Sequence, residues 1–332
     1  MKKKILALLL ALALVFTLVA CSTTAEEEET TAEETTQAVE LVTANVLAIN
    51  GPTAMGMVEL FDNEAYNFTF TSDATEVVSL MSTGAVDIAA CPLNIASNLF
   101  VKMEGEVQML AINTLGVLYV VVNTDVVGDL EINSMEDLIG QTVYTAGEGT
   151  TVEYILDYIV SENDMEDDMT IEFLSEHSEV STKLAAGEIG IAILPEPFVS
   201  VATAANETIE VSLSLTDEWD AVSDVQLAQG CVIASTAFIE ENPEAVEAFL
   251  ANYETSVDFM NNETESAAPI LVEYGVLASE AIVNNATENC NIVFITGEEM
   301  MEIAQANLQV YFDAEPTSIG GAMPTEDLYY IG

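Results

Sequence analysis

The sequence contains no arginine and only five lysines, against 57 acidic residues, which gives a formal net charge of −52 at pH 7. Three of the lysines are residues 2–4, so Lys102 and Lys183 are the only bases in the rest of the chain. Proteins that bind nucleic acid need clustered Lys and Arg side chains to neutralise phosphates. The composition therefore excludes nucleic acid as a partner. The acidity is typical of adaptation to high salt, of cation capture or simply of a solvated surface.

Motifs for catalysis and for metal binding are also missing from the sequence. It has one histidine and four cysteines, without a C-x-x-C pair, so we expect no metal site. We find no phosphate-binding Walker loop and no nucleophile with its base. These absences predict a protein that is not an enzyme and that carries no cofactor.

The amino terminus has the pattern of an export signal. Three lysines precede an apolar run from Ile5 to Ala20, and this run is shorter than the roughly 20 residues that span a membrane. Leu18-Val19-Ala20-Cys21 has the lipobox pattern of bacterial lipoproteins. We therefore expect residues 1–20 to be a cleaved signal peptide. Lipid on Cys21 would then anchor the mature chain to the outer face of the cell membrane.

Residues 21–40 consist mainly of Thr, Glu and Ala and cannot bury enough apolar surface to fold, so they predict a disordered acidic tether. Export also places the other cysteines in an oxidising compartment. Cys231 and Cys290 each lie in a strand-like run, where they would form a disulfide or remain buried free thiols. Cys91 ends an apolar strand and is expected in the core or in a pocket wall.

An internal repeat organises the remainder, which is long enough for two lobes. Residues 80–92 align without gaps to residues 183–195, and each copy reads as a helix end, a glycine stop, a buried strand and a proline-led turn. Upstream of each copy lies a strand, a glycine turn and a helix, with Pro52 opening the first helix and Thr150 and Glu153 forming a capping box before the second. Alternating strands and helices predict mainly parallel sheets.

Ligands of such sheets lie beyond the carboxyl ends of the strands. Two similar lobes would bring four turns to one cleft, and helix starts there offer backbone N–H groups to a polar ligand. These turns are Gly51 to Gly56, Cys91 to Asn94, Gly147 to Thr151 and Pro195 to Phe198.

Two runs are candidates for the connections between the lobes, residues 117–123 and 226–235. The runs 243–260 and 298–311 read as helices that return to the first lobe. We therefore predict a first lobe from residues 41–120 and 230–332, and a second lobe from residues 121–229.

Five motifs resemble the substrate-binding lipoproteins of nitrate, sulfonate and taurine ABC importers, a family that also resembles thiamine-pyrimidine synthases. They occur in the family's order and span nearly all of the globular part: Gly51–Met57, Ala111–Tyr119, Ser175–Val180, Leu194–Val199 and Gly320–Pro324. The resemblance implies an α/β type II periplasmic-binding-protein fold, two lobes with a ligand cleft between them. It also implies capture of a sulfonate, nitrate, taurine or pyrimidine-like molecule for an ABC transporter permease. Glu59 and Glu148 stand where relatives usually have lysines nearby, which argues against an anionic ligand.

The expected partners are thus a small-molecule ligand, the permease and the membrane, with the protein acting as a monomer. His177 is either a pH-sensitive donor in the cleft or a structural residue. Glu148 and Glu196 would hold a cation or amine, or be solvated; Phe198 would stack on a ring or fill core. Trp219 is expected to pack. The predicted ligand-binding residues are Gly51, Pro52, Thr53, Pro92, Asn94, Asn113, Glu148, Gly149, Thr150, Thr151, His177, Glu196 and Phe198.

Two alternatives remain open from the sequence. One is a surface lipoprotein without a transport role. The other is an enzyme like the pyrimidine synthases of this fold, although those use a cysteine-rich motif that has no counterpart here.

Overall fold

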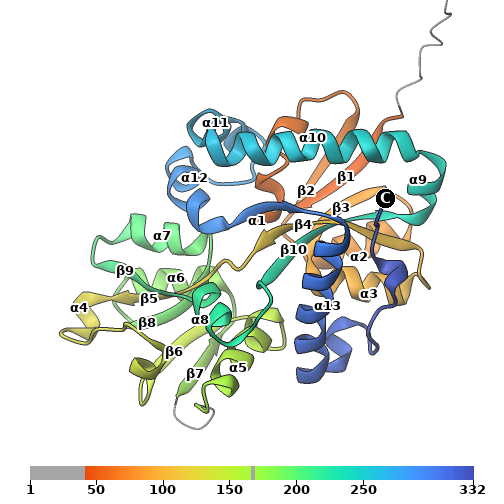
Figure 1. Ribbon diagram of the computed structural model, residues 1–332. Helices are drawn as coiled ribbons and strands as arrows, with labels where there is room; N and C mark the ends of the chain where they lie inside the picture. The colour runs from red at the N-terminus through yellow and green to blue at the C-terminus, as the bar shows by residue number, and fades with distance from the viewer. Residues whose placement is uncertain (1–41, 166–168) are drawn as a thin grey trace, which may run out of the picture. The chain divides into compact units, whose positions relative to one another are not determined.

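The computed structural model describes residues 42–165 and 169–332. The predicted signal peptide, the predicted tether and the predicted lipidation site Cys21 lie outside these residues. The described chain forms two α/β lobes, each around its own β-sheet (Figure 1). No helix within it is long and apolar enough to cross a membrane.

Lobe 1 is built on a six-stranded sheet with the order β11-β4-β10-β3-β1-β2, and lobe 2 on a five-stranded sheet with the order β7-β6-β8-β5-β9. The strands of lobe 1 are β1 (Ala44–Ile49), β2 (Tyr66–Thr71), β3 (Ile88–Pro92), β4 (Val107–Leu115), β10 (Ala228–Ser235) and β11 (Ile292–Ile295). Those of lobe 2 are β5 (Leu118–Asn123), β6 (Thr142–Ala146), β7 (Thr170–Leu174), β8 (Ile191–Pro195) and β9 (Ile209–Ser214).

The two sheets share one topology, which confirms the internal repeat. Strands β2, β1, β3 and β4 correspond to β7, β6, β8 and β9, and the helix before β3 and the helix before β8 are offset by the same 103 residues as the strands. Gly84 and Gly187 end these two helices with φ values of 67° and 72°, a left-handed conformation that favours glycine. The repeated glycine therefore fixes the same stop in both lobes.

The sheets are mixed, whereas the sequence predicted mainly parallel ones. β1 pairs in parallel with β2 and β3, and β6 with β7 and β8. β5 and β10 are antiparallel to their neighbours. β5 follows β4 of lobe 1 and enters the sheet of lobe 2, and β10 follows β9 of lobe 2 and enters the sheet of lobe 1. The runs expected as connections are thus mostly strands, and the chain crosses between the sheets at residues 116–117 and 223–227.

Helices cover both sheets (Figure 1). They are α1 (Pro52–Met55), α2 (Ala74–Ser82), α3 (Leu93–Lys102), α4 (Thr124–Val127), α5 (Thr151–Glu162), α6 (His177–Ala185), α7 (Phe198–Ala205), α8 (Leu215–Val222), α9 (Thr236–Glu241), α10 (Pro243–Asn262), α11 (Thr264–Glu273), α12 (Glu280–Ala286) and α13 (Gly297–Ala314). Short 3₁₀ helices include η1 (Val58–Leu60), η2 (Met135–Leu138), η3 (Thr287–Cys290), η4 (Pro316–Ile319) and η5 (Glu326–Leu328). The expected helices at residues 243–260 and 298–311 are therefore confirmed.

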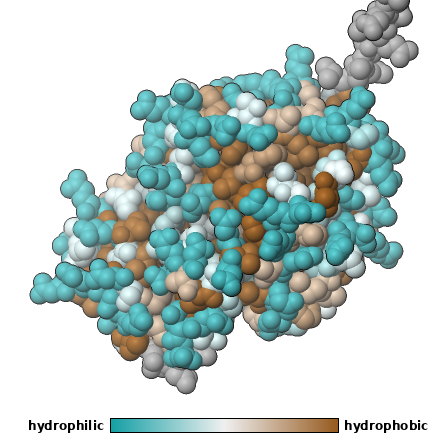
Figure 2. All heavy atoms as spheres, in the orientation of Figure 1, coloured by the Kyte–Doolittle hydropathy of each residue, from teal (hydrophilic) through white to brown (hydrophobic). Residues whose placement is uncertain are grey.

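Apolar packing divides into three clusters. One lies under α10 and α11 in lobe 1, a small one lies between α6, α7 and the sheet of lobe 2, and the largest contains residues of both lobes. On the face shown in Figure 2, hydrophilic residues cover most of the surface and hydrophobic residues form smaller patches between them.

The three cysteines in the described chain are buried and free. Cys231 is the register partner of Cys91 on the neighbouring strand, and its Sγ donates to the Cys91 carbonyl at 3.6 Å. Cys290 lies in η3. The structure therefore has buried thiols where the sequence left a Cys231–Cys290 disulfide open.

Candidate functional site

The parallel strands bring the predicted turns together in pairs. β1 and β3 are neighbours and end at Ile49 and Pro92, and β6 and β8 are neighbours and end at Ala146 and Pro195. Gly51 of the first turn has a φ of 110°, and a Cβ added to it would lie 4.0 Å from Cδ of Pro197 in the fourth turn. The first turn of lobe 1 therefore meets the fourth turn, which belongs to lobe 2.

The first turn is tied to β4 and β10 by polar contacts. Pro52 opens α1 as predicted. The Thr53 hydroxyl donates to the Ile49 carbonyl at 2.9 Å, and Asn113 Nδ2 donates to the Thr53 carbonyl at 3.0 Å. A Cβ on Gly230 would come within 2.6 Å of Asn113 Oδ1, so only glycine fits beside the buried amide. Thr53 and Asn113 thus both hold the turn in place.

In the second turn, Pro92 precedes α3, which begins without a side-chain cap. Asn94 Nδ2 donates to the Ser318 carbonyl at 3.5 Å, and Asn98 Nδ2 donates to the same oxygen at 2.6 Å. Asn94 is therefore used to hold η4 against α3. A Cβ added to Gly320 would lie 3.0 Å from Cβ of Val101 and 3.4 Å from the Cα of Asn98, which gives this glycine of the Gly320–Pro324 motif a structural role.

The third turn is held by hydrogen bonds among its own residues. Thr150 caps α5 by accepting from the Val152 N–H at 3.3 Å, and its hydroxyl donates to the Gly147 carbonyl at 2.6 Å. The Glu153 carboxylate accepts from the Gly149 N–H, one residue before the cap, so the predicted reciprocal capping box is not formed. The reason is that the Thr150 N–H already bonds to the Gly147 carbonyl. Glu148 is exposed and Thr151 half-buried.

The fourth turn contains a buried acid at the boundary of the lobes. Glu196 is only 3% exposed. Its carboxylate accepts from the N–H and hydroxyl of Ser200, both at 3.1 Å, and from Asn289 Nδ2 at 3.3 Å. Burial raises the pKa of the Glu196 carboxyl, and these hydrogen bonds partly oppose the rise. Because Asn289 belongs to η3, this acid links lobe 2 to lobe 1.

His177 lies beside Phe198 in lobe 2, with ring centroids 5.7 Å apart. Its Nδ1 has no hydrogen-bond partner among the described residues. Burial lowers the pKa of the imidazole to about 4, so His177 is neutral near pH 7. A neutral ring against an aromatic face fits a packing role, and Phe198 is itself half-buried against the small cluster of lobe 2.

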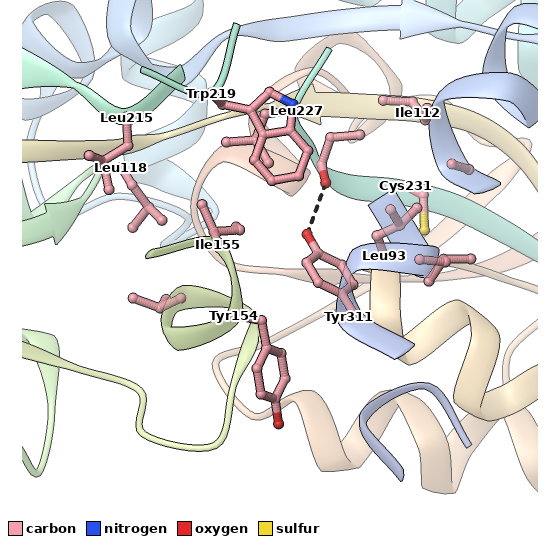
Figure 3. Packing of buried hydrophobic residues seen from close by; sticks show 14 of the residues in the cluster. Leu93, Ile112, Leu118, Tyr154, Ile155, Leu215, Trp219, Leu227, Cys231 and Tyr311 are labelled. Atoms are coloured by element: carbon pink, nitrogen blue, oxygen red, sulfur yellow. Dashed lines mark hydrogen bonds between the residues drawn. The ribbon is translucent and has the colours of Figure 1, made fainter. Parts of the chain in front are cut away.

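Aromatic residues that the sequence did not single out bridge the two lobes. The Tyr119 hydroxyl of β5 donates to the Asn289 carbonyl at 2.8 Å, and burial with the nearby Glu196 raises its pKa. The rings of Tyr154 in α5 and Tyr311 in α13 lie 6.3 Å apart (Figure 3). Trp219, predicted to pack, is 1% exposed in the same cluster, and its indole N–H donates to the Val225 carbonyl at 2.7 Å.

Figure 3 shows this junction between the lobes: Leu118, Ile155 and Leu215 of lobe 2 lie on one side, and Leu93, Ile112 and Tyr311 of lobe 1 on the other. Tyr119 lies in the Ala111–Tyr119 motif, so the sequence contained a signal that could have identified it. Asn289 lies in none. Among the described residues, no group of three or more His, Cys, Asp or Glu is placed to hold a metal ion.

Residues 67–267, more than half of the chain, match the family described as NMT1/THI5 like. The chain belongs to this NMT1/THI5-like family. No curated protein matches the sequence. The matched range contains three of the five motifs, Ala111–Tyr119, Ser175–Val180 and Leu194–Val199.

Solved structures confirm the periplasmic-binding-protein fold. A structure described as an ABC transporter from Parabacteroides distasonis is 20% identical, with a TM-score of 0.74 over 87% of this chain and 99% of that one. The periplasmic aliphatic sulphonate binding protein SsuA from Escherichia coli is 10% identical, with a TM-score of 0.66 over 87% and 92%. The alkanesulfonate-binding protein SsuA from Xanthomonas axonopodis pv. citri, bound to MOPS, is 12% identical, with a TM-score of 0.61 over 88% and 98%.

Proposed function

We propose that this NMT1/THI5-like chain is the extracytoplasmic solute-binding component of an ABC importer. It captures one small molecule between its lobes and presents the closed form to the permease. The proposed ligand-binding residues are those of the four turns, with His177 and Asn113 beside them. The protein acts as a monomer and catalyses no reaction.

The observation that carries this proposal is the meeting of strand-end turns from two topologically matched lobes. Gly51 and Pro197 approach each other across the boundary, and the described chain crosses between the sheets at only two short segments, 116–117 and 223–227. Two short crossings allow rigid lobes to rotate, and strand-end turns are where α/β sheets bind ligands. The matched solved structures of importers and sulfonate-binding proteins support the same function.

Localisation is part of the proposal. Export and lipid on Cys21 would keep the binding lobes close to a membrane permease. A tether raises the effective concentration of a ligand carrier at its partner, so a modest affinity for the permease suffices. Replacing Cys21 with Ser should release the mature protein from the membrane fraction, whereas replacing the adjacent Ser22 with Ala should not.

Solute capture is tested with the soluble mature chain. Trp219 is the only tryptophan and lies in the junction cluster, so its emission reports on lobe closure. We expect a bound solute to raise the melting temperature, reduce the radius of gyration in small-angle scattering and change the Trp219 emission. The proposal is wrong if native mass spectrometry of gently purified protein finds no retained small molecule and a broad solute panel changes none of these signals.

A further inference from the structure

Three helices of lobe 2 begin at the same sheet edge, because they follow the neighbouring strands β6, β7 and β8. A glutamate carboxylate accepts from a backbone N–H within or just before each of these starts. Glu153 accepts from the Gly149 N–H before α5, Glu179 from the Ser175 N–H before α6 at 3.4 Å, and Glu196 from the Ser200 N–H in α7 at 3.1 Å.

A helix start is the part of such a fold that best receives an anion, because its N–H groups are free and its dipole end is positive. In lobe 2, internal carboxylates already take that place. An external oxyanion would have to displace one of them or lie next to it.

The two lysines of the described chain do not offer a positive charge to an anionic solute. Lys102 is the last residue of α3, about 14 Å along the axis from the helix start at the second turn. Lys183 lies in the last turn of α6, where it is partly exposed and pairs with Glu179 at 3.3 Å. Lys102 is therefore remote from the turns and Lys183 is already paired with Glu179, and the sequence has no arginine that could bind an anion instead.

The charges that act on the junction are acidic on both sides. Besides burial, Glu196 and Asp217 raise the pKa of Tyr119, and Glu315, Glu153 and Asp157 raise that of Tyr154. A like charge placed between such groups costs energy, and screening weakens this cost only beyond about 10 Å at 0.1 M salt.

We infer that the solute carries no net negative charge: it is a neutral or cationic molecule. This rests on the proposed function and departs from the sulfonates and nitrate that the resemblance implied.

The test uses the soluble mature chain, incubated with a cell extract and analysed by native mass spectrometry, so that the retained molecule is identified. A neutral or cationic molecule supports the inference. A retained sulfonate, nitrate, phosphate or carboxylate anion overturns the inference and leaves solute capture standing. If nothing is retained, both the proposed function and this inference fail.

A second measurement addresses the helix start directly with benzenesulfonate as the probe. Glu153→Ala frees the Gly149 N–H, and we expect it to bind benzenesulfonate about tenfold more tightly than the wild type does. Glu162→Ala, at the other end of α5 and exposed, removes the same charge and is the matched control. Glu153→Gln guards against a folding effect, because it keeps the side-chain size and should act in the same direction. Equal binding by Glu153→Ala and Glu162→Ala overturns the inference.

Discussion

Glu196 and Asn289 join the two lobes by one hydrogen bond of 3.3 Å, from the amide of η3 to the buried carboxylate at the end of β8. The same Asn289 accepts from the Tyr119 hydroxyl through its carbonyl at 2.8 Å. A single residue of lobe 1 thus contacts two strands of lobe 2. This arrangement makes Asn289 the polar centre of the boundary.

Replacing Asn289 with Ala should lower the free energy of unfolding by about 1–3 kcal/mol, because the buried Glu196 carboxylate loses one of its donors. Urea denaturation followed by Trp219 emission measures the loss. Asn285→Ala, exposed on the neighbouring helix α12, should change stability by no more than about 0.5 kcal/mol. Equal effects of the two substitutions would show that the Glu196–Asn289 bond contributes nothing.

His177 should titrate far below an ordinary histidine. Burial lowers its pKa from 6.5 to about 4, so between these values the unfolded chain binds more protons than the folded one. The contribution of His177 to the free energy of unfolding is therefore at its maximum above pH 6.5. It falls by about 3 kcal/mol as the pH is lowered to 4. Relative to the wild type, His177→Gln should become more stable by that amount at pH 4.

The measurement for His177 is direct, because the chain has a single histidine and its ring Cε1–H resonance in proton NMR is unambiguous. A midpoint near 6.5 in the folded protein would contradict the burial argument. Comparing the wild type with His177→Gln at each pH cancels the titration of the many carboxylates.

Local patterns in the sequence predicted the repeat, six of the thirteen described α-helices and the four turns. Glycines such as Gly84 and Gly187 mark helix stops through their own backbone preference, and short apolar runs mark buried strands, so no knowledge of distant contacts is needed. The exchange of β5 and β10 between the lobes was not predictable in this way. An apolar strand shows that it is buried, but its sequence does not show which neighbours it pairs with.

The sequence located the four turns but not the residues that contact them across the lobe boundary. Asn289 lies 93 residues from Glu196 and 170 from Tyr119, and a polar contact over such separations leaves no local pattern. Thr150 and Glu153 show the opposite case. Their spacing predicted a capping box, but the Gly147 carbonyl accepts from the Thr150 N–H. The Glu153 carboxylate therefore accepts from the Gly149 N–H instead.

The first crossing between the lobes should not tolerate a larger residue at Gly116. A Cβ there would clash with the Thr216 hydroxyl and lie 2.8 Å from Cδ2 of Leu227. Gly116→Ala should therefore lower stability by about 1–3 kcal/mol through overpacking. The Thr216 hydroxyl is buried without a hydrogen-bond partner among the described residues, so Thr216→Ala alone should cost little.

The double variant Gly116→Ala, Thr216→Ala should recover part of the loss, with a coupling of about 0.5–3 kcal/mol in a double-mutant cycle. Additive effects in urea unfolding would mean that the two side chains do not meet at the crossing.

Salt should stabilise this chain through screening of its own charge. With a formal net charge of −52, acidic groups repel one another across the whole folded surface, and the compact state suffers more than the unfolded chain. The Debye length falls from about 30 Å at 0.01 M to about 8 Å at 0.15 M, so most of the gain should occur below about 0.3 M NaCl. We expect the melting temperature to rise by roughly 5 °C over that range, about 2 kcal/mol for a domain of this size. A rise that begins only above about 1 M would instead point to exclusion of salt from apolar surface, and a flat curve would show that the acids are too well solvated to interact.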